Sequence, residues 1–306
     1  MATGNNIILR QPGYAVLKAD VIQTGTEALR MARSNPRLTY NRYWSQLNQD
    51  SLIVPSRLAR HNADLAYAQL LALHEQAGKP EEVLFALPGN YTREQLALLL
   101  GITQACPFTA IGLVDAATAC VSAIADIGSY SHIDIHLHYA LITTLEVTDQ
   151  VARTSVRIID DAGTADIHET CAGFLAGQFI DQARFDPLHL VETEQMLYDQ
   201  IPASLQSMQG ADEVMLEISY RNKRYQARIF RDELLEKLKK HYERIYREIS
   251  GQSVSLVSDR LHALPGFTDK LDNAVVLDEQ AVFQGCNINL QNILTAGPSL
   301  SFITSL

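Results

Sequence analysis

The stretch of residues 133–147 places the strongest constraint on how this 306-residue chain can fold. Two runs of β-forming residues flank His136, Leu137 and His138. Such runs favour two strands that turn back on each other. A tight turn of this kind usually contains glycine or asparagine, because these residues adopt positive φ at little cost. We therefore expect a hairpin whose tip carries bulky side chains in place of the usual turn residues.

Composition and charge narrow the classes of function that this chain can have. Hydrophobic residues make up 47% of the sequence, and the formal net charge is −10. Binding to nucleic acid or to an anionic membrane needs clustered lysine and arginine, so we expect neither partner. Residues 1–10 lack the basic and apolar regions of a secretory signal, and no segment approaches the ~18 apolar residues of a membrane span. We expect a cytoplasmic protein with enough residues for two lobes.

The four cysteines give no sign of a zinc cluster or of a disulfide framework. Cys106, Cys120, Cys171 and Cys286 are far apart and form no C-x-x-C motif. Unpaired cysteines are among the most buried residues of proteins, so we expect buried free thiols. A nucleophilic Cys120 activated by a histidine is the alternative for this residue.

Apolar periodicity and turn residues predict alternating helices and strands in the first 130 residues. We expect a hairpin over 14–17 and 21–23, helices over 27–33 and 57–76, a strand over 82–87, a helix over 92–100, a strand over 110–114 and a helix over 115–124. Alternating elements of this kind indicate an α/β fold.

The rest of the chain repeats this pattern. We expect strands over 133–147 and 151–159, a helix over 172–185, a hairpin over 214–219 and 224–229, a helix over 230–249, a strand over 253–257 and a short helix over 278–286. The small residues Ala172, Gly173, Ala176 and Gly177 predict that their helix packs closely against a neighbour. Two α/β lobes in succession follow from this order, and they alone specify no function.

Six segments, taken in order, are similar to the motifs of one family. Residues 24–36 resemble V-G-x-x-A-x-x-x-A-x-x-N-P, residues 83–91 resemble a strand ending in V-P-A-Y-F, and residues 111–124 resemble I-I-N-E-P-T-A-A-A-L-A-Y. Residues 134–147 match D-L-G-G-G-T-F-D-I-S-I-I-E-I without a gap. Residues 253–267 resemble an adenosine motif, and residues 278–285 resemble D-E-A-V-A-I-G-A. The chain thus resembles the actin-like ATPase superfamily, and most closely the ATPase domain of the DnaK-type heat-shock chaperones.

The resemblance implies a two-lobed α/β fold of the actin-like, ribonuclease H-like type, with mixed sheets and an interlobe cleft. Residues 1–130 would form lobe I and residues 131–306 lobe II, with a return of the last segment to lobe I left open. The chain ends at Leu306 soon after the last matched segment. We therefore expect no peptide-binding domain and no ordinary chaperone activity.

The first phosphate loop of the family, D-x-G-T, falls on residues 9–13 of this chain. No acid is present there, and Pro12 lacks the N–H that a phosphate would need. Gln11 and Gly13 are the degenerate positions of this loop. The second loop keeps the first acid as Asp134, but its glycines are replaced.

In that second loop the resemblance places His136, Leu137 and His138 at the glycine positions and Tyr139 at the threonine. Glycine lets a backbone approach a phosphate closely, because no Cβ stands in the way. We expect the larger side chains to occupy the phosphate space. Losing one preorganised donor costs about 3 kcal/mol of transition-state stabilisation, so losing several should abolish ATP hydrolysis.

The remaining catalytic positions are also changed. The family's lysine falls near Trp44, with Arg42 close enough to supply a cation, and its N-E-P-T acid falls at Ala116, with Asp115 the nearest carboxylate. Asp115 can equally be a helix N-cap. The paired glycines of the adenosine motif fall on two polar residues, Ser258 and Asp259, and the acidic one would repel a polyphosphate.

The histidines in the hairpin could also form a metal site. At i and i+2 on a strand, His136 and His138 would share one face, and His132 with His168 or Asp134 could complete a site. The simpler interpretation is that the two histidines are polar residues of the cleft, hydrogen-bonded to neighbours. We expect no metal here.

These observations lead to the hypothesis of a catalytically degenerate, chaperone-ATPase-like protein that carries no cofactor and binds a protein partner or itself. One alternative is an enzyme that uses the cleft for acid–base or metal chemistry, with Asp115, Asp134, His136 and His138 as candidates. A second alternative is a divergent protein that still binds ATP and Mg²⁺. A filament-forming protein is a third.

Overall fold

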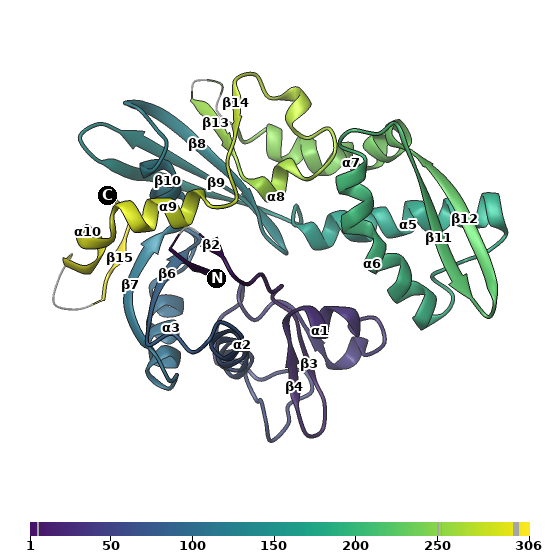
Figure 1. Cartoon of the computed structure of the whole chain (residues 1–306), viewed down its shortest axis with the longest axis horizontal. Coiled ribbons are helices and arrows are strands. Elements are labelled where there is room, and N and C mark those ends of the chain that lie inside the picture. The colour runs from purple at the N-terminus through teal and green to yellow at the C-terminus, as the bar shows by residue number, and fades with distance from the viewer. Residues whose placement is uncertain (5, 250, 252, 296–299) are drawn as a thin grey trace.

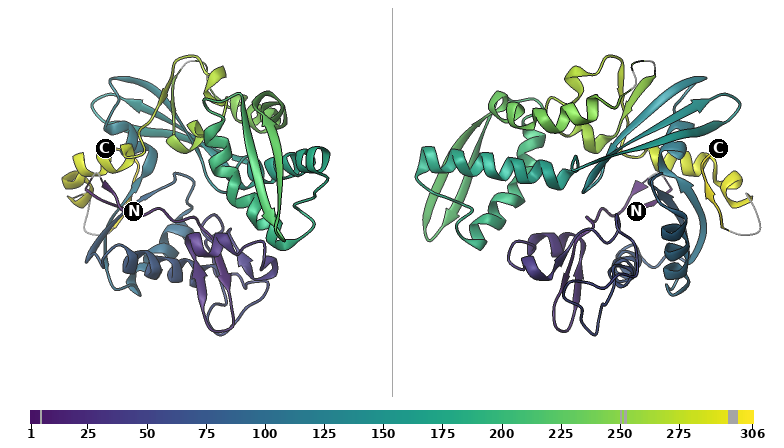
Figure 2. Two further views of the ribbon diagram at one scale, coloured as in Figure 1. Left: turned by 45° about the vertical axis from the view of Figure 1, so that its right-hand side comes forward. Right: turned by 180° about the vertical axis from the view of Figure 1, so that it is seen from behind.

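The chain folds into an α/β protein with mixed β-sheets that helices cover and connect (Figure 1). The computed structural model describes residues 1–4, 6–249, 251, 253–295 and 300–306. Figure 2 shows that the helices and the hairpin of residues 164–246 gather at one end of the molecule, while the C-terminus lies toward the other end. Within the described residues, no helix has the length and apolar character needed to cross a bilayer.

A five-stranded sheet organises the second half of the chain. Its strand order is β10 (Val151–Asp160), β9 (Tyr139–Val147), β8 (Gly128–Ile135), β13 (Val254–Val257) and β14 (Ala274–Val276). The first three strands are antiparallel neighbours, and β13 and β14 run parallel to β8. The hairpin predicted from residues 133–147 is confirmed as β8 and β9, and β9 forms a second hairpin with β10.

The largest core lies against one face of this sheet. Three helices and a two-stranded hairpin build it: α5 (Thr164–Ala183), α6 (Val191–Ser207), α7 (Arg231–Tyr246), β11 (Glu213–Tyr220) and β12 (Lys223–Phe230). The apolar stripe of α7 follows the predicted helical period. Phe179, Leu238 and Phe267 are completely buried in this core.

Shorter elements form the first half. They are β1 (Ala2–Thr3), β2 (Asn6–Ile7), β3 (Ala15–Leu17), β4 (Ile22–Thr24), α1 (Gly25–Arg30), a 3-10 turn η1 (Pro36–Leu38), β5 (Thr39–Tyr40), α2 (Asn62–Gln76), β6 (Glu82–Leu87), α3 (Arg93–Gln104), β7 (Thr109–Asp115) and α4 (Ala116–Ser122). Strands β6 and β7 are parallel, as βαβ units are, and α3 connects them. The predicted strand over 82–87 is confirmed with the same bounds.

The last elements are α8 (Asp259–His262), a second 3-10 turn η2 (Thr268–Lys270), α9 (Ala281–Ile288), α10 (Leu290–Thr295) and β15 (Phe302–Ile303). Strand β15 pairs in parallel with β7, so the end of the chain adds a strand to the sheet of the first half. Helix α9 packs against α4, and a Cβ at Gly285 would lie 1.6 Å from the Ala119 carbonyl oxygen. This glycine is therefore required by a close approach of two backbones.

Two predicted helix starts were wrong for local reasons. The helix predicted from residue 57 begins at Asn62, because the Ser56 hydroxyl accepts hydrogen bonds from the backbone N–H groups of Leu58 and Ala59 in a turn. The helix then starts with a capping box in which the Asp64 carboxylate accepts from the His61 N–H at 3.0 Å. The helix predicted from residue 172 begins eight residues earlier, at Thr164.

The predicted close packing of α5 through its small residues holds only in part. Ala172 and Ala176 are buried in the core, but a Cβ at Gly173 or Gly177 would meet no atom within 4 Å. The two glycines therefore face open space. Their packing role was predicted wrongly, because the buried stripe of α5 contains the alanines and not the glycines.

We predict that Gly285→Ala destabilises the protein by at least ~1–3 kcal/mol, because the new methyl group must displace the α4 backbone. Chemical denaturation of the purified variant measures this change. Gly173→Ala is the control: it adds the same methyl group to an exposed helix position and should stabilise by ~0.5–1 kcal/mol. Equal effects of the two substitutions would contradict the packing argument.

Candidate functional site

A pocket of about 640 Å³ lies where the carboxyl ends of the parallel strands meet. Pro88 follows β6, Ala116 follows β7, His136 follows β8, Ser258 follows β13 and Asp278 comes soon after β14, and all five residues line the pocket. Open α/β sheets commonly bind ligands beyond the carboxyl ends of their strands. The volume lies in the range typical of small-molecule sites.

Strand β8 divides its side chains between the core and this pocket. Ile133 and Ile135 are buried in the main core, whereas His132 and Asp134 line the pocket. Thr143 lies directly opposite His132 on β9 and lines the pocket too. Since alternate residues of a strand point to opposite faces, burial of the two isoleucines fixes the direction of the polar side chains.

Asp134 is the centre of the charged groups in the pocket. Its Oδ2 accepts a charge-assisted hydrogen bond from Arg260, and His136 Nε2 lies 3.5 Å from the same oxygen. Burial by itself would raise the pKa of the Asp134 carboxyl, but Arg260 and the two histidines hold this pKa well below its usual range. Asp134 is therefore an ionised, paired carboxylate and not a free general base.

The two pocket histidines are neutral at physiological pH. Burial lowers the pKa of the His136 imidazole to about 4 in spite of the Asp134 carboxylate, and it also lowers the pKa of His132. His136 packs against the Tyr139 ring at 4.8 Å between ring centroids. Its Nε2 atom is buried and makes no hydrogen bond.

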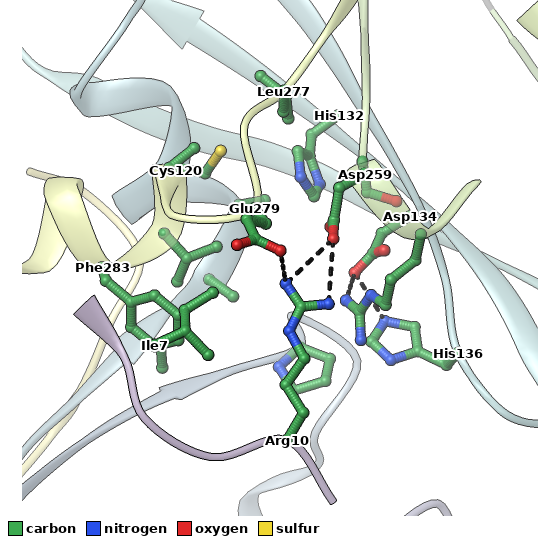
Figure 3. Close-up of a pocket in the computed structure, with 18 of the residues that line it drawn as sticks. Ile7, Arg10, Cys120, His132, Asp134, His136, Asp259, Leu277, Glu279 and Phe283 are labelled. Carbon is green, nitrogen blue, oxygen red and sulfur yellow. Dashed lines mark hydrogen bonds and ion pairs between the residues drawn. The ribbon is translucent and has the colours of Figure 1, made fainter. Parts of the chain in front are cut away.

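Arg10 reaches into the pocket from the N-terminal segment and bridges two carboxylates (Figure 3). Its guanidinium lies 3.4 Å from Asp259 and also pairs with Glu279. All three side chains are at least one-third exposed, so the pairs add little to stability. Because of these two pairs, the Arg10 guanidinium already has two anionic partners within the pocket.

The tip of the β8–β9 hairpin is bonded to helix α5 and not open to a ligand. The backbone N–H groups of Thr164 and Ala165, in the first turn of α5, donate to the carbonyls of His136 and Leu137 at 2.9 Å each. Gly163 permits this approach, because a Cβ there would lie 2.4 Å from the Leu137 oxygen. Helix N-termini often bind anions through such N–H groups, but here the N–H groups of Thr164 and Ala165 are hydrogen-bonded to the hairpin.

The prediction that His136 and His138 share one strand face was wrong. Both residues belong to the loop between β8 and β9, where strand alternation does not apply. His136 lines the pocket, whereas His138 Nε2 donates to the Asn41 carbonyl at 2.8 Å outside it. Of the four side chains expected to fill the phosphate space, only His136 lines the pocket; Leu137, His138 and Tyr139 do not.

Other predicted positions have structural partners. Gln11 lines the pocket, but its side chain accepts from the Thr26 N–H at 2.7 Å and donates to Gln76 at 2.9 Å. Gly13 lies against Trp44 and is not among the pocket residues, and Arg42 and Trp44 are not either. The remaining two predicted positions, Ser258 and Asp259, do line the pocket.

Ser258 and Asp115 act as helix N-caps. The Ser258 hydroxyl accepts from the Leu261 N–H at 3.3 Å. The Asp115 carboxylate accepts from the Thr118 N–H at 2.9 Å and pairs with Arg153 at 2.6 Å. Asp115 is completely buried and does not line the pocket, so the N-cap interpretation is confirmed.

The described part of the chain contains no group of three or more histidine, cysteine or acidic side chains that could hold a metal ion. His168 lies on α5 and is not a pocket residue. Cys120 does line the pocket, but burial raises the pKa of its thiol to about 12, so it is not an activated nucleophile. All four cysteines are free thiols; three are buried and Cys106 is half-buried.

Sequence reasoning missed Arg260, Arg10, Glu279 and Thr143. Arg260 and Asp134 are 126 residues apart in sequence, and nothing local to either residue indicates the pair. A weak signal exists for Thr143, which is a polar residue between Leu141 and Leu145 on one strand face. A polar residue among the apolar residues of one strand face is a reason to expect that this face borders a cavity.

Comparison with known proteins gave no assignment: no family model matches the chain, and no curated protein matches its sequence. The function must therefore be inferred from the chemistry of the pocket and from the topology around it.

We predict that His136 makes the fold less stable as the pH falls from 6.5 toward 4. The unfolded chain takes up a proton on this residue near pH 6.5, whereas the folded protein does so only near pH 4. Between these values the unfolded state binds more protons, so the free energy of unfolding should fall by up to ~1.4 kcal/mol per pH unit for this group. Urea denaturation at several pH values measures the slope.

His136→Gln should flatten that slope, since glutamine is polar but does not titrate. His189→Gln is the matched control, because His189 is exposed and distant in sequence from the pocket residues. An unchanged slope in His136→Gln would show that His136 is not buried in its neutral form.

Proposed function

We propose that this chain is a two-lobed, actin-like protein of the ribonuclease H-like type that does not hydrolyse ATP and acts by binding a protein partner or a second copy of itself. Lobe I would comprise residues 1–130 and lobe II residues 131–306, with the pocket in the cleft between them. The strand order β10-β9-β8-β13-β14, three antiparallel strands followed by two parallel ones, supports this proposal. Mixed sheets are what the resemblance to the actin-like superfamily implies.

The observation that carries the proposal is that the groups able to hold a phosphate are bonded to one another. Arg260 pairs with Asp134, and Arg10 pairs with Asp259 and Glu279. The first two N–H groups of α5 donate to the hairpin tip. A phosphate would have to break these bonds before it gained any of its own.

The balance of charge in the pocket opposes a polyphosphate as well. The described lining includes four carboxylates, from Asp134, Asp259, Asp278 and Glu279. Its cations are Arg10, Arg260 and the Met1 ammonium, which donates to the Leu9 carbonyl at 2.7 Å. The four carboxylates would repel an incoming triphosphate, and both arginines of the described lining are already paired with carboxylates.

Direct contacts join the two halves of the chain. Arg33, just after α1, lies 3.5 Å over the Tyr198 ring and pairs with Glu169 and Glu194 at 3.3 and 3.4 Å. The buried Gln195 side chain accepts from the Arg33 N–H and donates to the Leu29 carbonyl. In this proposal, the protein's own contacts maintain the relative position of the lobes, which suits a binding role.

We expect calorimetric titration with ATP to show no micromolar binding, with or without Mg²⁺, and we expect no phosphate release in a turnover assay. The physical reason is that the cations are paired and the loop N–H groups are occupied. Micromolar binding accompanied by turnover would overturn the proposal. Light scattering over a wide concentration range then separates self-association from binding to another protein.

A further inference from the structure

Residues 6–10, which we call the N-terminal strap, form part of the pocket wall. Ile7, Leu9 and Arg10 line the pocket. Ile7 and Leu9 are half-buried, whereas Ile8 between them is 46% exposed. Alternate residues of an extended segment point to opposite sides, so the strap turns one apolar face to the pocket and the other face to solvent.

The strap is hydrogen-bonded to the body of the molecule through one side chain. Within the described residues, its backbone hydrogen bonds run to residues 1–3, and β1 and β2 form a separate two-stranded sheet. The described hydrogen bonds that leave this small sheet are those of the Arg10 guanidinium to Asp259 and Glu279 (Figure 3). Apart from apolar contacts, the position of the strap over the pocket therefore depends on Arg10.

The residue that follows the strap is fixed in place. The Gln11 side chain accepts from the Thr26 N–H at 2.7 Å and donates to Gln76 at 2.9 Å. A Cβ at Gly25 would lie 2.2 Å from Gln11 Oε1, so this amide lies directly against the backbone at the start of α1. A swing of the strap would therefore pivot between Arg10 and Gln11.

The two ion pairs of the strap are open to water. The side chains of Arg10, Glu279 and Asp259 are 54%, 50% and 33% exposed. Pairs this exposed contribute little free energy, and salt screens them. They can shift an equilibrium between a closed and an open strap by a modest factor, but they cannot lock the closed position.

We infer that the N-terminal strap is a displaceable cover of the pocket and that Arg10 holds it closed by pairing with Asp259 and Glu279. In the closed position, the strap restricts entry to the pocket. Release of Arg10 lets residues 6–10 swing about Gln11, which widens the entrance and frees both carboxylates. This inference goes beyond the proposed function, because it concerns access to the pocket and is tested without any ligand or protein partner.

Cys120 reports on this movement, because it lines the pocket and is only 1% exposed. A small thiosulfonate reagent labels accessible thiols, and mass spectrometry of the digested protein locates the label. We expect Arg10→Ala to speed the labelling of Cys120 by about threefold or more, as the loss of two exposed ion pairs allows. Removing a cation near a thiol would by itself slow this reaction, so a faster rate reports on access.

Arg57→Ala is the matched control. It removes an equally exposed arginine pair, with Asp20 at 3.1 Å, and neither residue lines the pocket. The labelling rate of Cys120 should therefore stay unchanged in this variant.

Ionic strength supplies a second readout. Raising the salt from about 0.05 M to about 1 M should speed the labelling of Cys120 in the wild type, because screening weakens the Arg10 pairs, and should do so much less in Arg10→Ala. Cys171 is buried in the main core and is not a pocket residue, so it should stay unlabelled in both proteins. An unchanged rate in Arg10→Ala, an equal salt response of the two proteins, or labelling of Cys171 in step with Cys120 would each overturn the inference.

Discussion

The two-sided burial of strand β8 is the constraint on which the rest of the site depends. As the central strand of the five-stranded sheet, β8 has neighbours on both edges and side chains on two faces that differ completely in character. Ile133 and Ile135 anchor one face in the core, and Asp134 is thereby directed into the pocket. A slip of one residue would place the carboxylate among apolar side chains, at a large cost in free energy.

The position of β13 then decides how that carboxylate is satisfied. Val257 of β13 pairs with Ile133, and the chain continues directly into Ser258 and α8, which carries Arg260. The register of two strands that are distant in sequence thus brings a guanidinium to Asp134. The Asp134 carboxylate is buried whereas the Arg260 side chain is about half exposed, so loss of Arg260 would leave a buried carboxylate without this partner. The sheet register and the charge balance of the pocket are therefore coupled.

Internal pairing gives this pocket a character different from that of a phosphate site. Its cations and the first N–H groups of α5 have partners within the protein. Contacts around Arg33 join the two halves of the chain at a second place. The charges that would attract a polyphosphate are thereby already paired within the protein.

Local pattern determined much of this protein. The apolar run within 82–87 predicted β6 with the same bounds, the residues around Arg221 and Asn222 predicted the β11–β12 hairpin, and the apolar period of α7 predicted its buried face, because each of these follows from neighbours within a few residues. The start of α2 was missed, since a serine turn competes with the helix there.

Only the tertiary structure decided which polar groups meet. Asp134 with Arg260, and His138 with Asn41, depend on strand register and on the packing of segments about a hundred residues apart. The periodicity of one segment does not show which distant segment will pack against it.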